Sequence, residues 1–127
     1  MIEHAWLREI SIDIGYVPSY MTEELPVPQA GEAAQHFIEV FDTLDRVAAR
    51  KAFRLVEDAV RDGNEEEKNA AATGFLEAIL HAWDEGFDLE SIWPYVGPES
   101  REYCVAWNRF TGVFTPEWMC AVGQEPG

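Results

Sequence analysis

Apolar residues recur at steps of three and four along two consecutive stretches of the chain, and this spacing places them on one face of a helix. The pattern predicts helices near residues 32–47 and 49–62. Their apolar positions are Ala34, Phe37, Ile38, Phe41, Leu44 and Ala48, then Ala52, Phe53, Val56, Ala59 and Val60. Either a kink or a turn near Asp45–Ala49 divides the two helices. Gly63 is predicted to end the second helix in a left-handed conformation, which glycine adopts without steric cost.

A third helix, predicted near residues 64–85, has the best-marked start in the chain. Asn64 is an N-cap residue type, and Glu67 stands three positions later, as in a capping box. Three consecutive glutamates in the first turn also interact favourably with the helix dipole. The apolar face comprises Ala72, Phe75, Leu76, Ile79, Leu80 and Trp83, and Gly86 is predicted to end the helix.

A fourth helix is predicted near residues 98–111, with Pro98 at the first helical position, where proline is favoured. Its predicted inward face is Tyr103, Ala106, Trp107 and Phe110, with Cys104 beside it, and Gly112 is the expected stop. Thr115 and Pro116 repeat the signal for a helix start, so one last short turn is expected there. The tail beyond Gly123 is expected to be frayed.

Residues 1–30 carry weaker signals and are predicted to be irregular. Residues 6–14 fit either a helix or an extended stretch, because isoleucines alternate with polar residues at the end of this segment. Gly15, Pro18, Pro26 and Pro28 follow, and proline disfavours a regular helix. We therefore predict that residues 15–30 form a surface loop that lays Tyr16, Tyr20 and Met21 over the rest of the molecule.

Short links between the four predicted helices favour antiparallel neighbours. The sequence therefore predicts an all-α domain over residues 1–127, built as a bundle of about four main helices in stacked antiparallel hairpins. It is divided into an irregular segment (1–30), a helical core (31–112), and a C-terminal turn and tail (113–127). A length of 127 residues suits one such domain.

The chain is strongly acidic, with 24 Asp and Glu against 9 Lys and Arg and a formal net charge of −15. A composition that is 47% hydrophobic and 13% aromatic nevertheless predicts a folded domain rather than a disordered acidic tail. The charge argues against binding to nucleic acid phosphates, which requires Lys and Arg, and against docking on anionic lipid.

The compartment expected from the sequence is the cytoplasm. The first residues lack a basic start followed by an apolar stretch, so no signal peptide is expected, and no apolar run is long enough for a membrane span. Two cysteines, Cys104 and Cys120, are too few for a disulfide-stapled module and are predicted to be buried thiols, with a single bridge that closes a short C-terminal loop as the alternative.

No residue pattern indicates catalysis, a metal or a cofactor. His36 with Glu39, and His81 with Glu77 or Asp84, have helical spacing, but such pairs are expected by chance in a chain with 24 acidic residues. Their order also reverses the Glu-x-x-His motif of di-metal bundles. Neither a Gly-x-Ser-x-Gly elbow nor a phosphate-binding loop occurs, so no enzyme is predicted.

The candidate binding site is an acidic and aromatic stretch from Asp84 to Glu102. Its first carboxylates flank a predicted helix end, where negative charge is unfavourable. A solvated surface would explain any one acidic cluster, but here the carboxylates surround aromatic residues that a loop could expose. Charge would steer a basic partner, and the aromatic rings would supply contact energy. The predicted partner-binding residues are Asp84, Glu85, Asp88, Glu90, Trp93, Tyr95, Glu99 and Glu102.

The segment from Asn64 to Leu80, together with residues 53–57, resembles a family of small bacterial all-helical proteins of unknown biochemistry. In size, acidity and lack of catalytic residues the chain also resembles the immunity proteins that neutralise polymorphic toxins. The resemblance covers about residues 36–110. It implies a cytoplasmic protein that binds a toxin domain tightly and blocks its active site.

The leading hypothesis is therefore an acidic inhibitor, an immunity protein whose partner is a basic toxin domain such as a nuclease. One alternative is a nucleic-acid mimic that antagonises a DNA-binding protein. Another is a small scaffolding protein or homo-oligomer, since five tryptophans are many for one small core. A small enzyme or metal-binding bundle is a further alternative.

Overall fold

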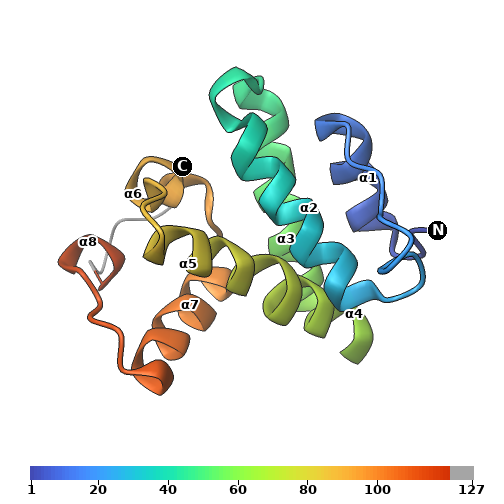
Figure 1. Ribbon diagram of the computed structural model, residues 1–127. Helices are drawn as coiled ribbons and strands as arrows, with labels where there is room; N and C mark the ends of the chain where they lie inside the picture. Colours follow the sequence, from blue (N-terminus) through green and yellow to red (C-terminus); the bar gives the residue numbers. More distant parts are fainter. Residues whose placement is uncertain (121–127) are drawn as a thin grey trace.

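The computed structural model describes residues 1–120, and all regular structure in that range is helical (Figure 1). In chain order the elements are α1 (Ala5–Ile14), α2 (Pro26–Val40), the 3₁₀ turn η1 (Phe41–Thr43), α3 (Arg46–Asp62), α4 (Glu65–Asn69), the π-helical segment η2 (Ala70–Leu76), α5 (Glu77–Asp84), α6 (Leu89–Ile92), the 3₁₀ turn η3 (Trp93–Tyr95), α7 (Pro98–Thr111) and α8 (Glu117–Cys120). The predicted all-α class is confirmed. The tail beyond Gly123 lies outside the described residues.

The finer prediction of about four main helices in a bundle is not confirmed. Helical segments α1, α6 and α8 add to the four predicted stretches, and the third stretch contains the π-helical segment η2. Figure 1 shows how these pieces are arranged: α4, η2 and α5 form one long helix across the molecule. Helices α1, α2 and α3 lie mainly along its first half, and α6, α7 and α8 gather around its second half.

The prediction that residues 1–30 are irregular holds for residues 15–25 but not for the segments on either side. Helix α1 occupies residues 5–14, which is the helical one of the two alternatives left open for residues 6–14, and its buried apolar side chains Trp6, Leu7, Ile10 and Ile14 follow helical spacing. Helix α2 begins at Pro26, six residues before the predicted start. Prolines in a first helical turn cost little, because backbone N–H groups there have no acceptor within the helix.

The loop between α1 and α2 also differs from its prediction. Tyr16 is buried, as expected for a side chain that covers the molecule. Tyr20 and Met21, however, are exposed. This loop therefore covers the core with one of the three predicted side chains and presents the other two to solvent.

Helix α2 and helix α3 are separated by a turn, the second of the two alternatives left open by the sequence. The first helix ends at Val40, and η1 follows it directly. Asp45 then caps α3, since its carboxylate accepts a hydrogen bond from the Val47 N–H at 2.8 Å. Local capping therefore starts α3 at Arg46, three residues earlier than the apolar pattern predicted.

Gly63 ends α3 for a reason other than the one predicted. Its φ of −70° and ψ of 166° are extended, not left-handed. A Cβ atom at this position would lie 2.5 Å from the carbonyl oxygen of Ala59 and 2.9 Å from the Cβ of Glu67. The glycine is required because the chain passes too close to itself for a side chain.

Two helix starts and one stop agree closely with the sequence. Asn64 and Glu67 form the predicted capping box, with reciprocal hydrogen bonds of 2.8 and 3.0 Å between side chain and backbone. Helix α7 begins at Pro98 and ends before Gly112, whose φ of 77° is left-handed. These signals are local, so neighbouring residues alone determine them.

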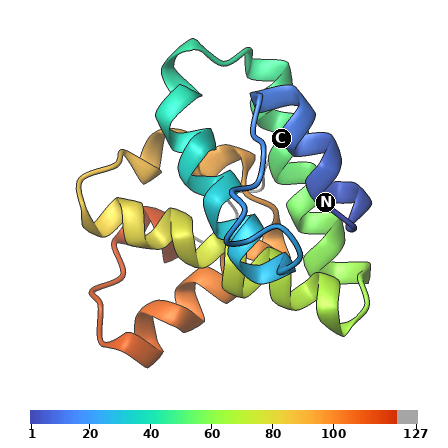
Figure 2. The ribbon, with the colours of Figure 1, turned by 45° about the vertical axis from the view of Figure 1, so that its right-hand side comes forward.

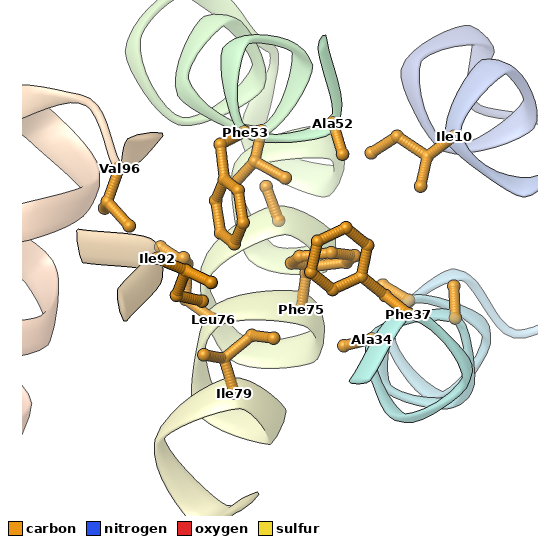
Figure 3. Close-up of a cluster of buried hydrophobic side chains, with 14 of the residues drawn as sticks. Ile10, Ala34, Phe37, Ala52, Phe53, Phe75, Leu76, Ile79, Ile92 and Val96 are labelled. Carbon is orange, nitrogen blue, oxygen red and sulfur yellow. The ribbon is translucent and has the colours of Figure 1, made fainter. Parts of the chain in front are cut away.

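Three buried phenylalanines form the centre of the molecule, and we call Phe37, Phe53 and Phe75 the phenylalanine core. Figure 3 shows their rings pointing toward one another from α2, α3 and η2. The ring centroids are 5.4 Å apart for Phe37 and Phe53, and 6.2 and 6.1 Å from Phe75. Each such aromatic pair adds about 0.5–1.5 kcal/mol to the burial of the side chains.

Helix α2 crosses η2 at close range because both surfaces carry small residues. The buried alanines are Ala30, Ala33 and Ala34 on α2, and Ala70, Ala71 and Ala72 on η2. A Cβ on Gly74 would lie 2.6 Å from the Val27 carbonyl oxygen and 2.7 Å from the Ala30 Cβ. The π-helical segment is therefore part of the core packing.

A buried carboxylate joins α7 to α3. Glu57 of α3 accepts hydrogen bonds from the backbone N–H groups of Glu99 and Ser100, at 3.0 and 2.9 Å, and from the Ser100 hydroxyl at 2.8 Å. These N–H groups belong to the first turn of α7, where no acceptor within the helix is available. Glu57 thus fixes the N-terminal end of α7 against the core.

Among residues 1–120, no helix combines the length and the apolar character that crossing a membrane would require.

Candidate functional site

The six carboxylates of the predicted site are all exposed: Asp84, Glu85, Asp88, Glu90, Glu99 and Glu102. Two of them have local roles. Asp88 caps α6 by accepting a hydrogen bond from the Ser91 N–H at 3.3 Å, and Glu85 lies 3.5 Å from the His81 ring. The charge near the end of α5 is therefore explained in part by the start of the next helix.

Neither of the two predicted aromatic anchors is fully exposed. Trp93 is only 3% exposed, and its ring packs edge-on against Trp118, with the centroids 5.7 Å apart. The Arg101 guanidinium lies 5.3 Å from its ring centroid, and Arg101 Nη2 donates to the Trp93 carbonyl at 2.9 Å. This burial does not fit the predicted role of Trp93 as a partner anchor, because η3 directs the side chain into the core.

Tyr95 is half-buried against α3. Its hydroxyl accepts a hydrogen bond from Arg46 Nη1 at 2.6 Å, and the Arg50 guanidinium lies 5.7 Å from the ring centroid. Two arginines of the same chain thus hold both the edge and the face of this ring. The predicted role of Tyr95 as a partner anchor is not supported by this geometry.

Two other aromatic side chains are fully presented to solvent, and we call them the exposed phenyl pair. Phe110 is 84% exposed and Phe114 is 83% exposed. The sequence pattern placed Phe110 on the inward face of α7. The buried residues of α7 are instead Ser100, Cys104 and Asn108, so the inward face is rotated and largely polar.

A cleft of about 300 Å³ lies between α5 and α7. The two helices diverge toward their C-terminal ends (Figure 2). The lining residues are Glu77, Leu80, His81, Trp83 and Asp84 from α5, Trp107, Asn108 and Thr111 from α7, and Val113 beyond it. Asp84 is the one residue of the predicted site that lines this α5–α7 cleft.

Two carboxylates give the α5–α7 cleft its charge. Glu77 accepts a hydrogen bond from the Tyr103 hydroxyl, and burial together with this bond raises the pKa of Tyr103 to about 12. Asp84 is exposed at the end of α5. Within residues 1–120, neither Glu77 nor Asp84 forms an ion pair with a Lys, Arg or His. The cleft therefore carries negative charge that the described chain does not neutralise.

Two half-buried tryptophans line the same cleft. The Trp83 ring meets Trp118 of α8 edge-on, with the centroids 5.9 Å apart. The Trp107 ring centroid lies 6.0 Å from that of Phe110. Trp107 thus connects the cleft to the exposed phenyl pair.

Among the cysteines and histidines of residues 1–120, His81 lines this cleft and the others lie elsewhere. Cys104 is buried, and burial raises the pKa of its thiol to about 12, whereas Cys120 is exposed, contrary to the prediction of two buried thiols. His4 and His36 bond elsewhere, to Glu66 and to a backbone carbonyl. Residues 1–120 contain no group of three or more side chains arranged to hold a metal ion.

A carboxylate organises the loop at the other end of the molecule. Glu32 accepts hydrogen bonds from the hydroxyls of Tyr16 at 2.6 Å, and of Ser19 and Thr22 at 2.8 Å each. Burial opposes ionisation of Glu32, but these bonds outweigh it and lower the pKa of the carboxyl group. This network could not be predicted from the sequence, because it joins residues of a loop to a residue of a helix.

A family model for a domain of unknown function, DUF7674, matches residues 4–112. The chain belongs to the DUF7674 family. The DUF7674 region extends from α1 to the end of α7 and includes every residue that lines the cleft except Val113. Phe114 and α8 lie beyond it. No curated protein and no solved structure significantly matches the chain.

Proposed function

We propose that this DUF7674 protein is a non-enzymatic, acidic inhibitor that binds another protein in the cytoplasm. Its partner is the basic domain of a bacterial toxin, whose active site it covers in the manner of an immunity protein. The net charge of −15 supports a basic partner, since charge complementarity speeds association and disfavours acidic competitors.

The observation that carries this proposal is the exposed phenyl pair beside a cleft with unneutralised carboxylates. Phe110 is 84% exposed and lies against Trp107, which lines the cleft with Asp84. Large apolar side chains that gather on a surface are typical of interaction sites, and Phe110, Val113 and Phe114, close together in the sequence at the end of α7, are all exposed. Burying one phenylalanine in an interface contributes about 1.5–3 kcal/mol.

In the proposed interface, apolar residues provide the binding energy and charged residues guide association. Phe110 and Phe114 are its anchors, because desolvated aromatic side chains provide most of the energy at protein interfaces. The exposed carboxylates of the predicted site, among them Glu85 and Glu90, steer the approach of a basic domain through their long-range field. Trp93 and Tyr95 have no contact role and serve to hold the fold.

The test is calorimetric binding to a basic toxin domain encoded next to the gene. The double variant Phe110→Ala/Phe114→Ala is expected to weaken binding at least about 100-fold, since it removes both anchors. The matched control is Tyr20→Ala/Met21→Ala, which removes two equally exposed apolar side chains from the α1–α2 loop and is expected to leave binding unchanged.

Three results would contradict the proposal. Neighbouring toxin domains could all bind more weakly than micromolar, or the two double variants could weaken binding equally. The third is a dimer in sedimentation that Phe110→Ala/Phe114→Ala dissociates. That result would assign the exposed phenyl pair to contacts between two copies of the chain.

A further inference from the structure

We propose that the α5–α7 cleft receives one arginine side chain of the partner protein. This inference rests on the proposed function, because it supplies the chemistry by which the cleft recognises a protein. Its size agrees with such a role: at about 300 Å³ it is at the lower end of the range for ligand pockets. A single long side chain fills such a space, whereas a folded element does not.

The cleft has one carboxylate near its inner end and another near its opening, and both favour a cationic group. Glu77 and Asp84 are seven residues apart, two turns along the same face of α5, which separates them by about 10 Å. Glu77 is half-buried and Asp84 is exposed, so one carboxylate lies inside the cleft and the other at its mouth. An arginine side chain is long enough to enter past Asp84 and place its guanidinium at Glu77.

Glu77 is held in position for this contact. The Tyr103 hydroxyl donates to its Oε2 atom, and within residues 1–120 its Oε1 atom has no hydrogen bond. Asn108 lines the same cleft and is only 1% exposed. Its Nδ2 atom donates to the Met119 sulfur at 3.6 Å. The Glu77 carboxylate is thus the acceptor within the cleft for guanidinium N–H donors.

The tryptophans favour a planar cation. Trp83 of α5 and Trp107 of α7 line the cleft from its two helices. A guanidinium group stacks on an indole face and is attracted by its π electrons, while its N–H donors stay free for carboxylates. Other occupants fit less well. An anion would meet two carboxylates, and an apolar group would leave them desolvated without partners.

The test uses a small probe and the indole N–H signals in a ¹H–¹⁵N NMR spectrum. Titration with N-acetyl-arginine amide is expected to shift the Trp83 and Trp107 signals saturably and to leave those of Trp6 and Trp93 unchanged. N-acetyl-citrulline amide has nearly the same shape without the charge and is expected to cause no saturable shift.

Variants locate the probe in the cleft. Asp84→Asn is expected to weaken binding of the arginine probe up to about 5-fold, the range for an exposed ion pair. Trp107→Leu is expected to weaken it about 3- to 30-fold through loss of the cation–π contact. Glu24→Gln, an exposed carboxylate of the α1–α2 loop outside the cleft, is the matched control and is expected to have no effect.

Equal shifts with the citrulline probe, or no saturable shift with the arginine probe, would overturn the inference. Failure here is distinguishable from failure of the proposed function. A protein that binds a toxin domain but not the arginine probe would be an inhibitor without an arginine site. If the protein binds the arginine probe at Trp107 but binds no toxin domain, the arginine site is supported and the proposed toxin partner is wrong.

Discussion

The two halves of the molecule use aromatic residues in opposite ways. In the first half, the phenylalanine core brings together three rings that are at most 1% exposed, each from a different element. In the second half, Trp83, Trp107 and Trp118 are half-buried, and the exposed phenyl pair has no cover. The first arrangement contributes to stability, and the second leaves apolar surface in water, which favours binding.

The difference follows from how each half is packed. Small residues let α2 approach η2 closely, and Phe75 fills the space between helices. Helix α7, in contrast, is fixed at its N-terminal end by Glu57 and diverges from α5 toward its C-terminal end (Figure 2). A helix held at one end leaves a cleft at the other, and the cleft is where the acidic and aromatic side chains meet.

The largest effect is expected for Phe75→Ala in the phenylalanine core. Its ring contacts Phe37, Phe53 and Trp6, so truncation should lower the free energy of unfolding by about 3–5 kcal/mol. The matched variant Phe110→Ala should change it by less than about 0.5 kcal/mol, because that ring is already exposed. Chemical denaturation measures both, and equal losses would contradict the contrast between the two halves.

The next largest loss of stability is expected when Glu57, the carboxylate that joins the two halves, is removed. Glu57→Ala leaves the first N–H groups of α7 without an acceptor and should lower the free energy of unfolding by about 2–3 kcal/mol. Asp58→Ala is the control, since Asp58 forms only a surface ion pair with Arg61. Denaturation midpoints that fall equally for the two variants would remove the assigned role of Glu57.

The two glycines of the helix crossing should respond with opposite signs. Gly74→Ala should destabilise the protein by about 1–3 kcal/mol, because its Cβ would overlap α2. Gly31→Ala should stabilise it by about 0.5–1 kcal/mol, because the nearest atom to its Cβ would be 3.6 Å away and alanine favours a helix. Thermal unfolding measures both. Stabilisation by Gly74→Ala would show that the crossing is not closely packed.

A smaller and local effect is expected from acid at Glu32. Since its pKa is lowered in the folded protein, the stabilisation it provides is complete above the ordinary glutamate pKa of about 4.3. It is lost as the pH falls through the lowered value. The protection factor of the Ser19 amide, whose N–H donates to Glu32 at 3.2 Å, should therefore fall in acid. In Glu32→Gln this protection should be low at all pH values, and a persistent acid transition there would contradict the assignment.

Local signals were the part of the fold that the sequence predicted well. The capping box at Asn64, the start at Pro98 and the stop at Gly112 depend on neighbouring residues alone. The start of α2 at Pro26 was missed, since two prolines indicate a break unless they lie in the first turn. Recognising that position requires knowing which residues α2 packs against.

The candidate site depended more on contacts between distant residues. The exposed carboxylates, including Asp84, could be predicted because charged side chains in acidic runs remain in solvent. The burial of Trp93 could not, since it depends on Trp118 and Arg101. The outward position of Phe110 was missed because the hydrogen bond between Glu57 and Ser100 sets the rotation of α7. The face of α7 that is buried as a result is largely polar, and in the sequence it resembles a face exposed to solvent.

The central claim is that the cleft end of the molecule, not the loop end, meets the partner. Hydrogen–deuterium exchange of the protein with and without the bound toxin domain tests it most directly. We expect new protection in residues 77–84 and 107–114, with none in residues 15–25. Protection confined to residues 15–25, or spread equally over both ends, would contradict it.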